Sequence, residues 1–171
     1  MLIGLCGMPR SGKSEVRKIL VEEHGFHLLD TKLVLREMAS KLTGLYPSEF
    51  VSQEDKEKLY CGVSRRKIMG ELGNVAEKLW GDSFLINRAL EEGWIYPEKD
   101  IVVDSLRKTQ PRDFPGYVYQ VISNRAIDTG NDFDKFWPYN TKGVIINDGT
   151  FEELREKVDL LVKTLREQRN E

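Results

Sequence analysis

The chain has 171 residues, of which 40% are hydrophobic and 32% are charged, and its formal net charge at pH 7 is −2. This length allows a single domain with a proper hydrophobic core, and the composition is ordinary for a globular enzyme. Because the charge is nearly balanced and no block of lysine or arginine stands out, we expect no broad nucleic-acid-binding surface.

The two cysteines and the apolar start of the sequence indicate the cellular setting. Cys6 and Cys61 lack the spacing of metal ligands, and we expect no disulfide between them, which fits a reducing, intracellular environment. The apolar run of residues 2–6 is too short to span a membrane, so we interpret it as neither a signal peptide nor an anchor. We therefore expect a cytoplasmic protein without membrane contact.

The first predicted element is a buried strand over residues 2–6, and a phosphate-binding pattern follows it directly. Residues 7–14 read Gly-Met-Pro-Arg-Ser-Gly-Lys-Ser, which fits G-x-x-x-x-G-K-[ST] and leads into a helix predicted for residues 12–24. In such a loop the backbone N–H groups and the helix N-terminus bind phosphate oxygens, Lys13 reaches the outer phosphates, and the Ser14 hydroxyl binds Mg²⁺. We therefore expect a bound nucleoside triphosphate on this phosphate loop, contacted by Gly7, Pro9, Arg10, Ser11, Gly12, Lys13 and Ser14.

The middle of the chain is predicted to be mostly helical after a short strand at residues 26–29. Helical spacing of apolar residues predicts a helix over residues 31–42, whereas the polar stretch 46–61 has no clear period. A further helix starts after Ser64, halts near residues 73–74 and resumes to residue 80; the next covers residues 83–92. The charged run 54–58 fits a solvated helix face, but in an α/β enzyme an excursion such as residues 46–61 could also cover a substrate pocket.

Three arginines in this helical region are candidate phosphate ligands. Arg36 lies on the helix after the second strand, close enough to a nucleotide cleft to hold a second phosphate group. Arg65 and Arg66 begin a helix, where cations oppose the helix dipole, and this mild conflict favours a functional role. The alternative is that all three simply keep a helix surface soluble.

The last third of the chain alternates strands with turns and ends in a helix. Continuous β-branched runs predict strands at residues 101–103, 117–122 and 144–146, each buried on both faces. Residues 151–166 form the final helix, for which Thr150 and Glu153 make a capping box. The order of elements predicts a parallel sheet of about five strands with flanking helices, in which ligands bind at the carboxyl ends of the strands.

Asp104 ends the strand at residues 101–103, where an acidic side chain can hold Mg²⁺ through water or accept a proton. It could equally cap a turn. Three residues later, Arg107 can pair with a substrate phosphate. Arg125 opens a polar segment, residues 124–140, which we interpret as a short lid whose Arg125 and Lys135 close on the phosphates.

These residues together resemble the P-loop nucleoside monophosphate kinases. The resemblance is carried by residues 7–14, 30–37 and 103–107. In this superfamily an arginine on the helix after the second strand binds the acceptor phosphate, and Arg36 occupies the matching place. The resemblance implies that Asp30 and Arg36 contact the acceptor, and that the fold is the three-layer α/β/α P-loop NTPase fold.

Within the superfamily, the bacteriophage-type deoxynucleoside monophosphate kinases are the most similar family. Residues 10–13, Arg-Ser-Gly-Lys, match their loop, and residues 65–74, 80–84 and 144–154 match later stretches. In such kinases the turn within the last stretch lies near the donor adenine, which implies that Asn147 and Gly149 contact the nucleotide. The opening residues and the Asp104-x-x-Arg107 pattern also resemble archaeal adenylate-kinase-like and dephospho-coenzyme-A-kinase-like proteins.

The sequence therefore predicts an ATP- and Mg²⁺-dependent kinase that phosphorylates a nucleoside or deoxynucleoside monophosphate. It would be a single domain, residues 1–171, with an acceptor-binding region at residues 31–93 and a lid at residues 124–140. The sequence leaves open whether the protein forms a homodimer. One alternative is a kinase of dephospho-coenzyme A or another small molecule, and another is a nucleotide-binding sensor with little turnover. The predicted catalytic residues are Lys13, Asp104 and Arg125, the predicted Mg²⁺ ligands Ser14 and Asp104, and the predicted acceptor ligands Asp30, Arg36, Arg65, Arg66 and Arg107.

Overall fold

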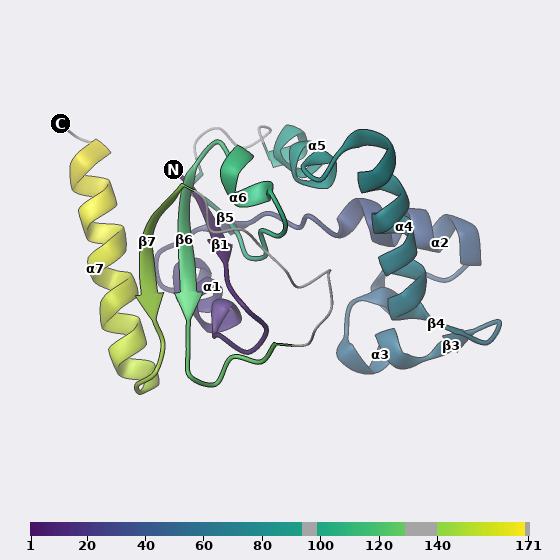
Figure 1. Cartoon of the computed structure of the whole chain (residues 1–171), viewed down its shortest axis with the longest axis horizontal. Coiled ribbons are helices and arrows are strands. Elements are labelled where there is room, and N and C mark those ends of the chain that lie inside the picture. Colours follow the sequence, from purple (N-terminus) through teal and green to yellow (C-terminus); the bar gives the residue numbers. More distant parts are fainter. Residues whose placement is uncertain (94–98, 129–139, 170–171) are drawn as a thin grey trace. The chain divides into compact units, whose positions relative to one another are not determined.

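The computed structural model describes residues 1–93, 99–128 and 140–169 (Figure 1). The chain divides into two compact units, of which unit 1 comprises Met1–Leu29 with Tyr96–Glu171, and unit 2 comprises Asp30–Ile95. Within the described ranges, no helix has the length and apolar character needed to cross a membrane.

Unit 1 is built on a five-stranded sheet in the order β2-β5-β1-β6-β7, and every pairing in it is parallel. The five segments predicted as strands form it: β1 (Leu2–Cys6), β2 (His27–Leu28), β5 (Ile101–Val103), β6 (Tyr117–Ile122) and β7 (Thr141–Ile146). The prediction of an α/β fold with a parallel sheet of five strands is therefore confirmed. β1 is the central strand: it pairs with β5 on one side and with β6 on the other, and one further strand lies beyond each of them.

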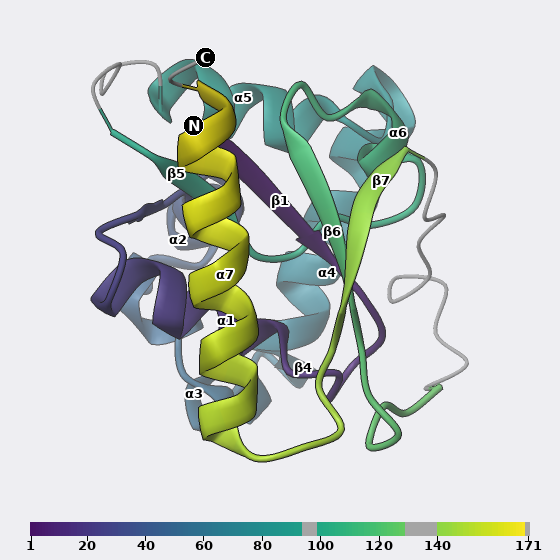
Figure 2. The same cartoon turned by 90° about the vertical axis from the view of Figure 1, so that its left-hand side faces the viewer.

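Two helices cover one face of this sheet, α1 (Lys13–Glu22) and α7 (Phe151–Arg169), as Figure 2 shows. Their buried residues recur at intervals of three or four and share one core with the strands: Val16, Ile19 and Leu20 from α1, and Leu154, Val158, Val162 and Leu165 from α7. The predicted capping box at the start of α7 is present, since Thr150 and Glu153 exchange two hydrogen bonds of 3.2 Å.

The opposite face of the sheet packs very closely at Gly4. A Cβ atom on this residue would lie 2.4 Å from the Leu106 side chain and 2.8 Å from the Phe114 ring. Phe114 directly follows α6 (Gln110–Asp113), a short helix that the sequence patterns did not predict. Glycine is therefore needed in the middle of β1 so that these side chains can lie against the sheet.

Unit 2 is a helical unit with its own core around Phe50, which is fully buried. The core also includes Leu35 and Ala39, as well as Met69 and Ala76. The elements of the unit are α2 (Leu33–Thr43), the 3₁₀ helix η1 (Pro47–Phe50), α3 (Gln53–Glu57), β3 (Leu59–Tyr60), β4 (Val63–Ser64), α4 (Arg65–Trp80) and α5 (Phe84–Gly93).

One expectation for this unit is wrong, and one stretch without a predicted element is ordered. The predicted halt near residues 73–74 is absent, and α4 runs unbroken over its sixteen residues. Gly73 is buried in it, between Met69 and Ala76, which both belong to the core, so packing outweighs the helix penalty of about 1 kcal/mol that a glycine carries. The polar stretch 46–61 also contains ordered elements, η1, α3 and β3, the second of which is capped by the Ser52 hydroxyl.

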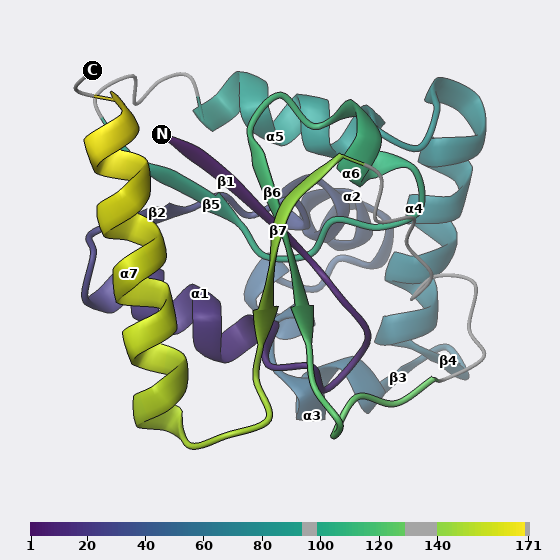
Figure 3. The same cartoon turned by 60° about the vertical axis from the view of Figure 1, so that its left-hand side comes forward.

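The parallel sheet brings the functional loops of unit 1 to one edge. Figure 3 shows β6 and β7 pointing the same way, with their carboxyl ends next to each other. Backbone hydrogen bonds join these segments to β1 and its loop: Ile127 N donates to Pro9 O in the loop (3.0 Å), and Leu106 N donates to Leu5 O in β1 (2.9 Å). The phosphate loop after β1 therefore lies beside the segments that follow β5 and β6.

Candidate functional site

The phosphate loop passes so close to its neighbours that two of its positions accept only glycine. A Cβ atom on Gly7 would lie 2.4 Å from the backbone oxygen of Val121, and one on Gly12 would lie 1.9 Å from Asn147 Nδ2. Both glycines have positive φ angles, 150° and 99°, and so does Arg10, at 62°. This conformation turns the chain tightly from β1 into α1 and leaves the first N–H groups of α1 at the loop.

The Lys13 side chain folds back over this loop. Its ammonium donates hydrogen bonds to the backbone oxygens of Gly7 (2.7 Å) and Met8 (2.9 Å). These bonds hold a positive charge at the N-terminus of α1, where the helix dipole already favours an anion. The loop therefore offers the positive charge and the helix N-terminus that suit an anion.

A cavity of about 700 Å³ opens beside the loop, within unit 1. This volume lies in the range of small-molecule sites. Its lining combines the loop and the start of α1 with the segments that follow β6 and β7: Arg10, Gly12, Lys13, Ser14, Glu15, Arg125, Asn147, Gly149, Phe151 and Leu154.

Most of the predicted nucleotide contacts line this cavity. The structure brings Arg10, Gly12, Lys13 and Ser14 together with Asn147 and Gly149, whereas Gly7, Pro9 and Ser11 shape the loop without lining the cavity. Sequence reasoning missed the wall residues Phe151 and Leu154. The signal for them was their place at the start of a helix that follows the predicted adenine turn.

Asn147 ties the turn after β7 to the phosphate loop. It is 6% exposed, its side-chain amide donates to Ser11 O (3.0 Å), and its backbone N–H donates to Ile122 O (2.8 Å). Arg125 in turn donates through Nη2 to Asn147 O (2.7 Å) and through Nε to Ser123 Oγ (3.3 Å). This network fixes Arg125 in the wall of the cavity.

Only part of the predicted lid is described. Residues 124–128 follow β6, and Asn124 N donates to Asp148 Oδ1 (2.6 Å). Residues 129–139, which contain Lys135, lie outside the described residues. The lid therefore stays a prediction.

Asp104 follows β5 and pairs with a residue of α1 that sequence reasoning missed. Arg17 Nη1 lies 2.9 Å from Asp104 Oδ2, and the two side chains are 36% and 22% exposed. Arg17 stands four residues after Lys13, a spacing that places both cations on one face of the helix and could have pointed to it. Arg107, the predicted phosphate ligand, donates its backbone N–H to Gln110 Oε1 (2.7 Å).

The oxygen donors of unit 1 suit Mg²⁺. This ion is bound through one or two carboxylates, waters and substrate phosphates rather than by an all-protein cage. Ser14 offers a hydroxyl at the cavity and Asp104 a carboxylate at the same edge of the sheet, and the described residues contain no cluster of three or more metal-binding side chains. The residues present therefore fit a Mg²⁺ ion that arrives with a nucleotide.

In unit 2, Arg36 pairs with Asp30, and a lysine lies near them. Arg36 Nη2 contacts Asp30 Oδ2, and the Arg36 side chain is only 12% exposed. The pKa of Lys56 is lowered, first because the side chain is half-buried and then because the charges of Arg66 and Arg36 disfavour its protonated form. Lys56 was missed because it stands in the charged run 54–58, which resembles an ordinary solvated helix face.

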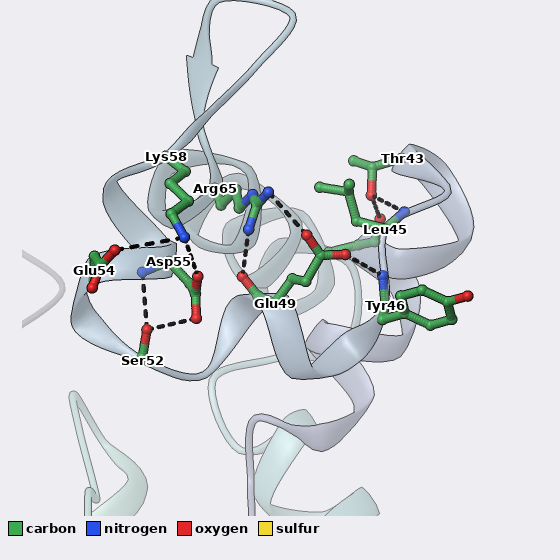
Figure 4. A network of polar contacts seen from close by, with 10 residues as sticks. Thr43, Leu45, Tyr46, Glu49, Ser52, Glu54, Asp55, Lys58 and Arg65 are labelled. Carbon is green, nitrogen blue, oxygen red and sulfur yellow. Dashed lines mark hydrogen bonds and ion pairs between the residues drawn. The ribbon is translucent and has the colours of Figure 1, made fainter.

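Arg65 is bound into the frame of unit 2, as Figure 4 shows. It is 8% exposed and donates to the backbone oxygen of Glu49 (3.0 Å) and to Glu49 Oε1 (3.1 Å). The other carboxylate oxygen of Glu49 accepts from Tyr46 N (2.9 Å). Arg66, by contrast, is exposed and pairs with Glu57 at 2.6 Å.

Comparisons with known proteins bear on the fold. No model of a known protein family matches the chain, and no curated protein matches it. Solved structures do match the chain, and two of them match over nearly their whole length. The protein TT1252 from Thermus thermophilus is 18% identical, with 96% of this chain and 97% of that chain covered and a TM-score of 0.56. The dephospho-CoA kinase from Campylobacter jejuni is 14% identical, with 98% of both chains covered and a TM-score of 0.57. The chain shares their fold.

Proposed function

We propose that this protein is a kinase that transfers the γ-phosphoryl group of ATP to a small phosphorylated acceptor, with a nucleoside or deoxynucleoside monophosphate as the preferred class. The observation that carries this proposal is the cavity in which the phosphate loop, Lys13 and Ser14 meet Arg125 and the Asn147 turn. A fold shared with a dephospho-CoA kinase supports the assignment to kinases.

The donor half of the reaction is assigned to unit 1. The loop amides and the Lys13 ammonium bind the β- and γ-phosphates, and Arg125 binds negative charge from the cavity wall. Phe151 and Leu154 provide apolar contacts for the base, next to the turn at Asn147. When bound through Ser14 and Asp104, Mg²⁺ would neutralise charge on the transferred phosphate. These residues act by positioning and charge, which is how most phosphoryl transfer is accelerated.

The acceptor half is assigned to unit 2. We include Arg36, Lys56 and Arg66 among the residues that bind the acceptor phosphate. Lys56 lies close enough to both arginines for their charges to lower its pKa. A bound anion would offset the mutual repulsion of these three cationic side chains. We leave Arg65 out, since it is 8% exposed and both of its Nη atoms donate to Glu49. Asp30 stays a candidate for contact with the acceptor, and Arg107, which belongs to unit 1, for contact with its phosphate.

A second candidate acceptor is dephospho-coenzyme A. The similarity in fold to a dephospho-CoA kinase over 98% of both chains favours it as much as it favours any other small-molecule kinase. That acceptor presents a hydroxyl, so Asp104 would have to accept its proton. A monophosphate needs no base, since its attacking oxygen is already ionised.

Coupled measurement of ADP release tests the proposal. The full chain is supplied with ATP and Mg²⁺ and with one acceptor at a time, from a panel of ribo- and deoxynucleoside monophosphates and dephospho-coenzyme A. We expect at least one monophosphate to accelerate ADP release, and Lys13→Ala purified in parallel to abolish it. Acceleration by dephospho-coenzyme A alone would replace the acceptor class. ATP binding with no acceleration by any acceptor would favour the nucleotide sensor.

A further inference from the structure

Arg17 stands one helical turn after the phosphate-loop lysine. Lys13 and Arg17 are separated by four residues on α1, so both lie on the same face of that helix. An arginine on an exposed helix face normally points to solvent, yet Arg17 reaches across to the sheet and pairs with a residue 87 positions later in the sequence.

Its partner, Asp104, is held beside the loop by the sheet. The preceding residue, Val103, is in register with Gly4 of β1, the strand that leads into the loop. Two residues later, Leu106 N donates to Leu5 O. The backbone on both sides of Asp104 is therefore fixed against β1, and its side chain lies against the beginning of α1.

The contact uses only one of the two carboxylate oxygens. Arg17 Nη1 donates to Asp104 Oδ2 at 2.9 Å, and among the described residues no hydrogen bond to Oδ1 is present. A hydrogen bond to one oxygen restrains the rotation of the carboxylate and leaves the other oxygen available to a further partner.

We propose that Arg17 is a positioning residue for the metal-binding carboxylate, holding Asp104 so that Oδ1 receives the hydrated Mg²⁺ of a bound nucleotide. This inference rests on the proposed function only in that the protein binds MgATP. Partners of this kind, which orient a metal ligand without touching the metal, typically change metal affinity by about 10- to 100-fold when removed.

An alternative role for Arg17 would change the Mg²⁺ affinity in the opposite direction. The Arg17 guanidinium is positive and could compete with Mg²⁺ for the carboxylate, in which case removing it would strengthen metal binding. Its single bond to Oδ2 and its 36% exposure argue for positioning, because water screens the repulsion while the bond still fixes the carboxylate.

A binding experiment without any acceptor distinguishes positioning of Asp104 from competition with Mg²⁺. A fluorescent ATP analogue is bound to the full chain in EDTA, and Mg²⁺ is then titrated. We expect Arg17→Ala to raise the half-saturating Mg²⁺ concentration about tenfold, with metal-free analogue affinity changed less than threefold. Arg17→Lys should recover part of the loss, because a lysine keeps a donor to Oδ2. Lys18→Ala, which removes an exposed cation from the same helix, should change neither value.

Comparison with Asp104→Asn completes the test. If Arg17 acts through Asp104, the double variant should need no more Mg²⁺ than Asp104→Asn alone. A half-saturating concentration that falls or stays unchanged in Arg17→Ala would overturn the inference, and so would additive effects in the double variant. Failure of the acceptor assay would reject the kinase and leave this result standing, because the titration measures nucleotide and metal binding alone.

Discussion

The side-chain amide of Asn147 donates a 3.0 Å hydrogen bond to the backbone oxygen of Ser11, so the turn after the last strand holds the phosphate loop directly. Both residues are buried, and they are separated by 136 positions in the sequence. The two sides of the cavity beside the loop are thereby fixed to each other, which would lower the entropy lost when a ligand binds there.

Asn147→Ala should weaken ATP binding and reduce stability together. The substitution leaves the buried Ser11 oxygen without its donor, a change that costs roughly 1–3 kcal/mol. We expect the midpoint of urea unfolding to fall accordingly and the Kd for ATP to rise about tenfold. Asn124→Ala, at an exposed position in the neighbouring segment, is the control and should change neither value. Unchanged ATP affinity in Asn147→Ala would show that the loop does not depend on this contact.

Gly12→Ala should abolish nucleotide binding, because the new methyl group would lie 1.9 Å from Asn147 Nδ2. Gly44→Ala is the matched control. Its φ of 74° is also positive, but nothing lies within 4 Å of the added atom, so only the backbone penalty of about 1–2 kcal/mol applies. We expect this control to lose stability in thermal unfolding and to keep its ATP affinity. Equal ATP affinity in the two variants would contradict the close approach at Gly12.

Arg65→Ala and Arg66→Ala should affect different properties. Arg65 is nearly buried against Glu49, so its removal should lower the free energy of unfolding by roughly 1–3 kcal/mol. Arg66 is exposed, and its pair with Glu57 should contribute less than about 1 kcal/mol. If Arg66 binds the acceptor, its removal raises the acceptor KM instead. Chemical unfolding and steady-state kinetics on both variants measure the two effects. A large loss of stability in Arg66→Ala together with a raised KM alone in Arg65→Ala would contradict both assignments.

Arg36→Ala and Lys56→Ala should each raise the acceptor KM or lower kcat by tenfold or more. Each removes one charge-assisted contact to a phosphate, while the Kd for ATP should stay unchanged. Lys41→Ala, an exposed cation on the same helix as Arg36, serves as the control. Normal kinetics in Lys56→Ala would remove this lysine from the acceptor site.

The two cysteines should differ sharply in reactivity. Burial raises the pKa of the Cys6 thiol to about 12, so it stays protonated at pH 8, whereas Cys61 is exposed. We expect one thiol per chain to react with a maleimide in the native protein and two in denaturant, with Cys61→Ser eliminating the native reaction. Because Cys6 ionises more readily when unfolded, its contribution to stability is full below about pH 9 and decreases as the pH rises further. Rapid labelling of Cys6 in the native protein would contradict its burial.

The sheet and the phosphate loop could be predicted because their signals are local. A β-branched run such as residues 101–103 indicates a strand without knowledge of its neighbours, and Gly7 and Gly12 mark the loop by spacing alone. Helix continuity could not be predicted in the same way. The Gly73–Asn74 pair suggests a stop, and only the core around Met69 and Ala76 keeps α4 intact.

The contacts of the site were harder to predict, since they join distant segments. Arg17 meets Asp104 through the register between β1 and β5, which no local pattern reveals. Lys56 was hidden in a charged run, and the packing of helices in unit 2 brings it near Arg36. For Arg65, the sequence pointed to an unusual cation at a helix start but not to Glu49, sixteen residues earlier, as its partner.

The central place of β1 in the sheet has a consequence for how the protein reaches its folded state. β1 precedes its two partners in the sequence by about a hundred residues, because β5 starts at Ile101 and β6 at Tyr117. Pairings of such long separation form slowly, since a large loop must close before any contact compensates for the lost chain entropy. During synthesis the apolar residues of β1 must therefore wait for later segments, and the loop receives its support only after Asn147 has been made. The proposed nucleotide site would thus be completed late, and a ligand bound there would stabilise only molecules whose sheet is already complete.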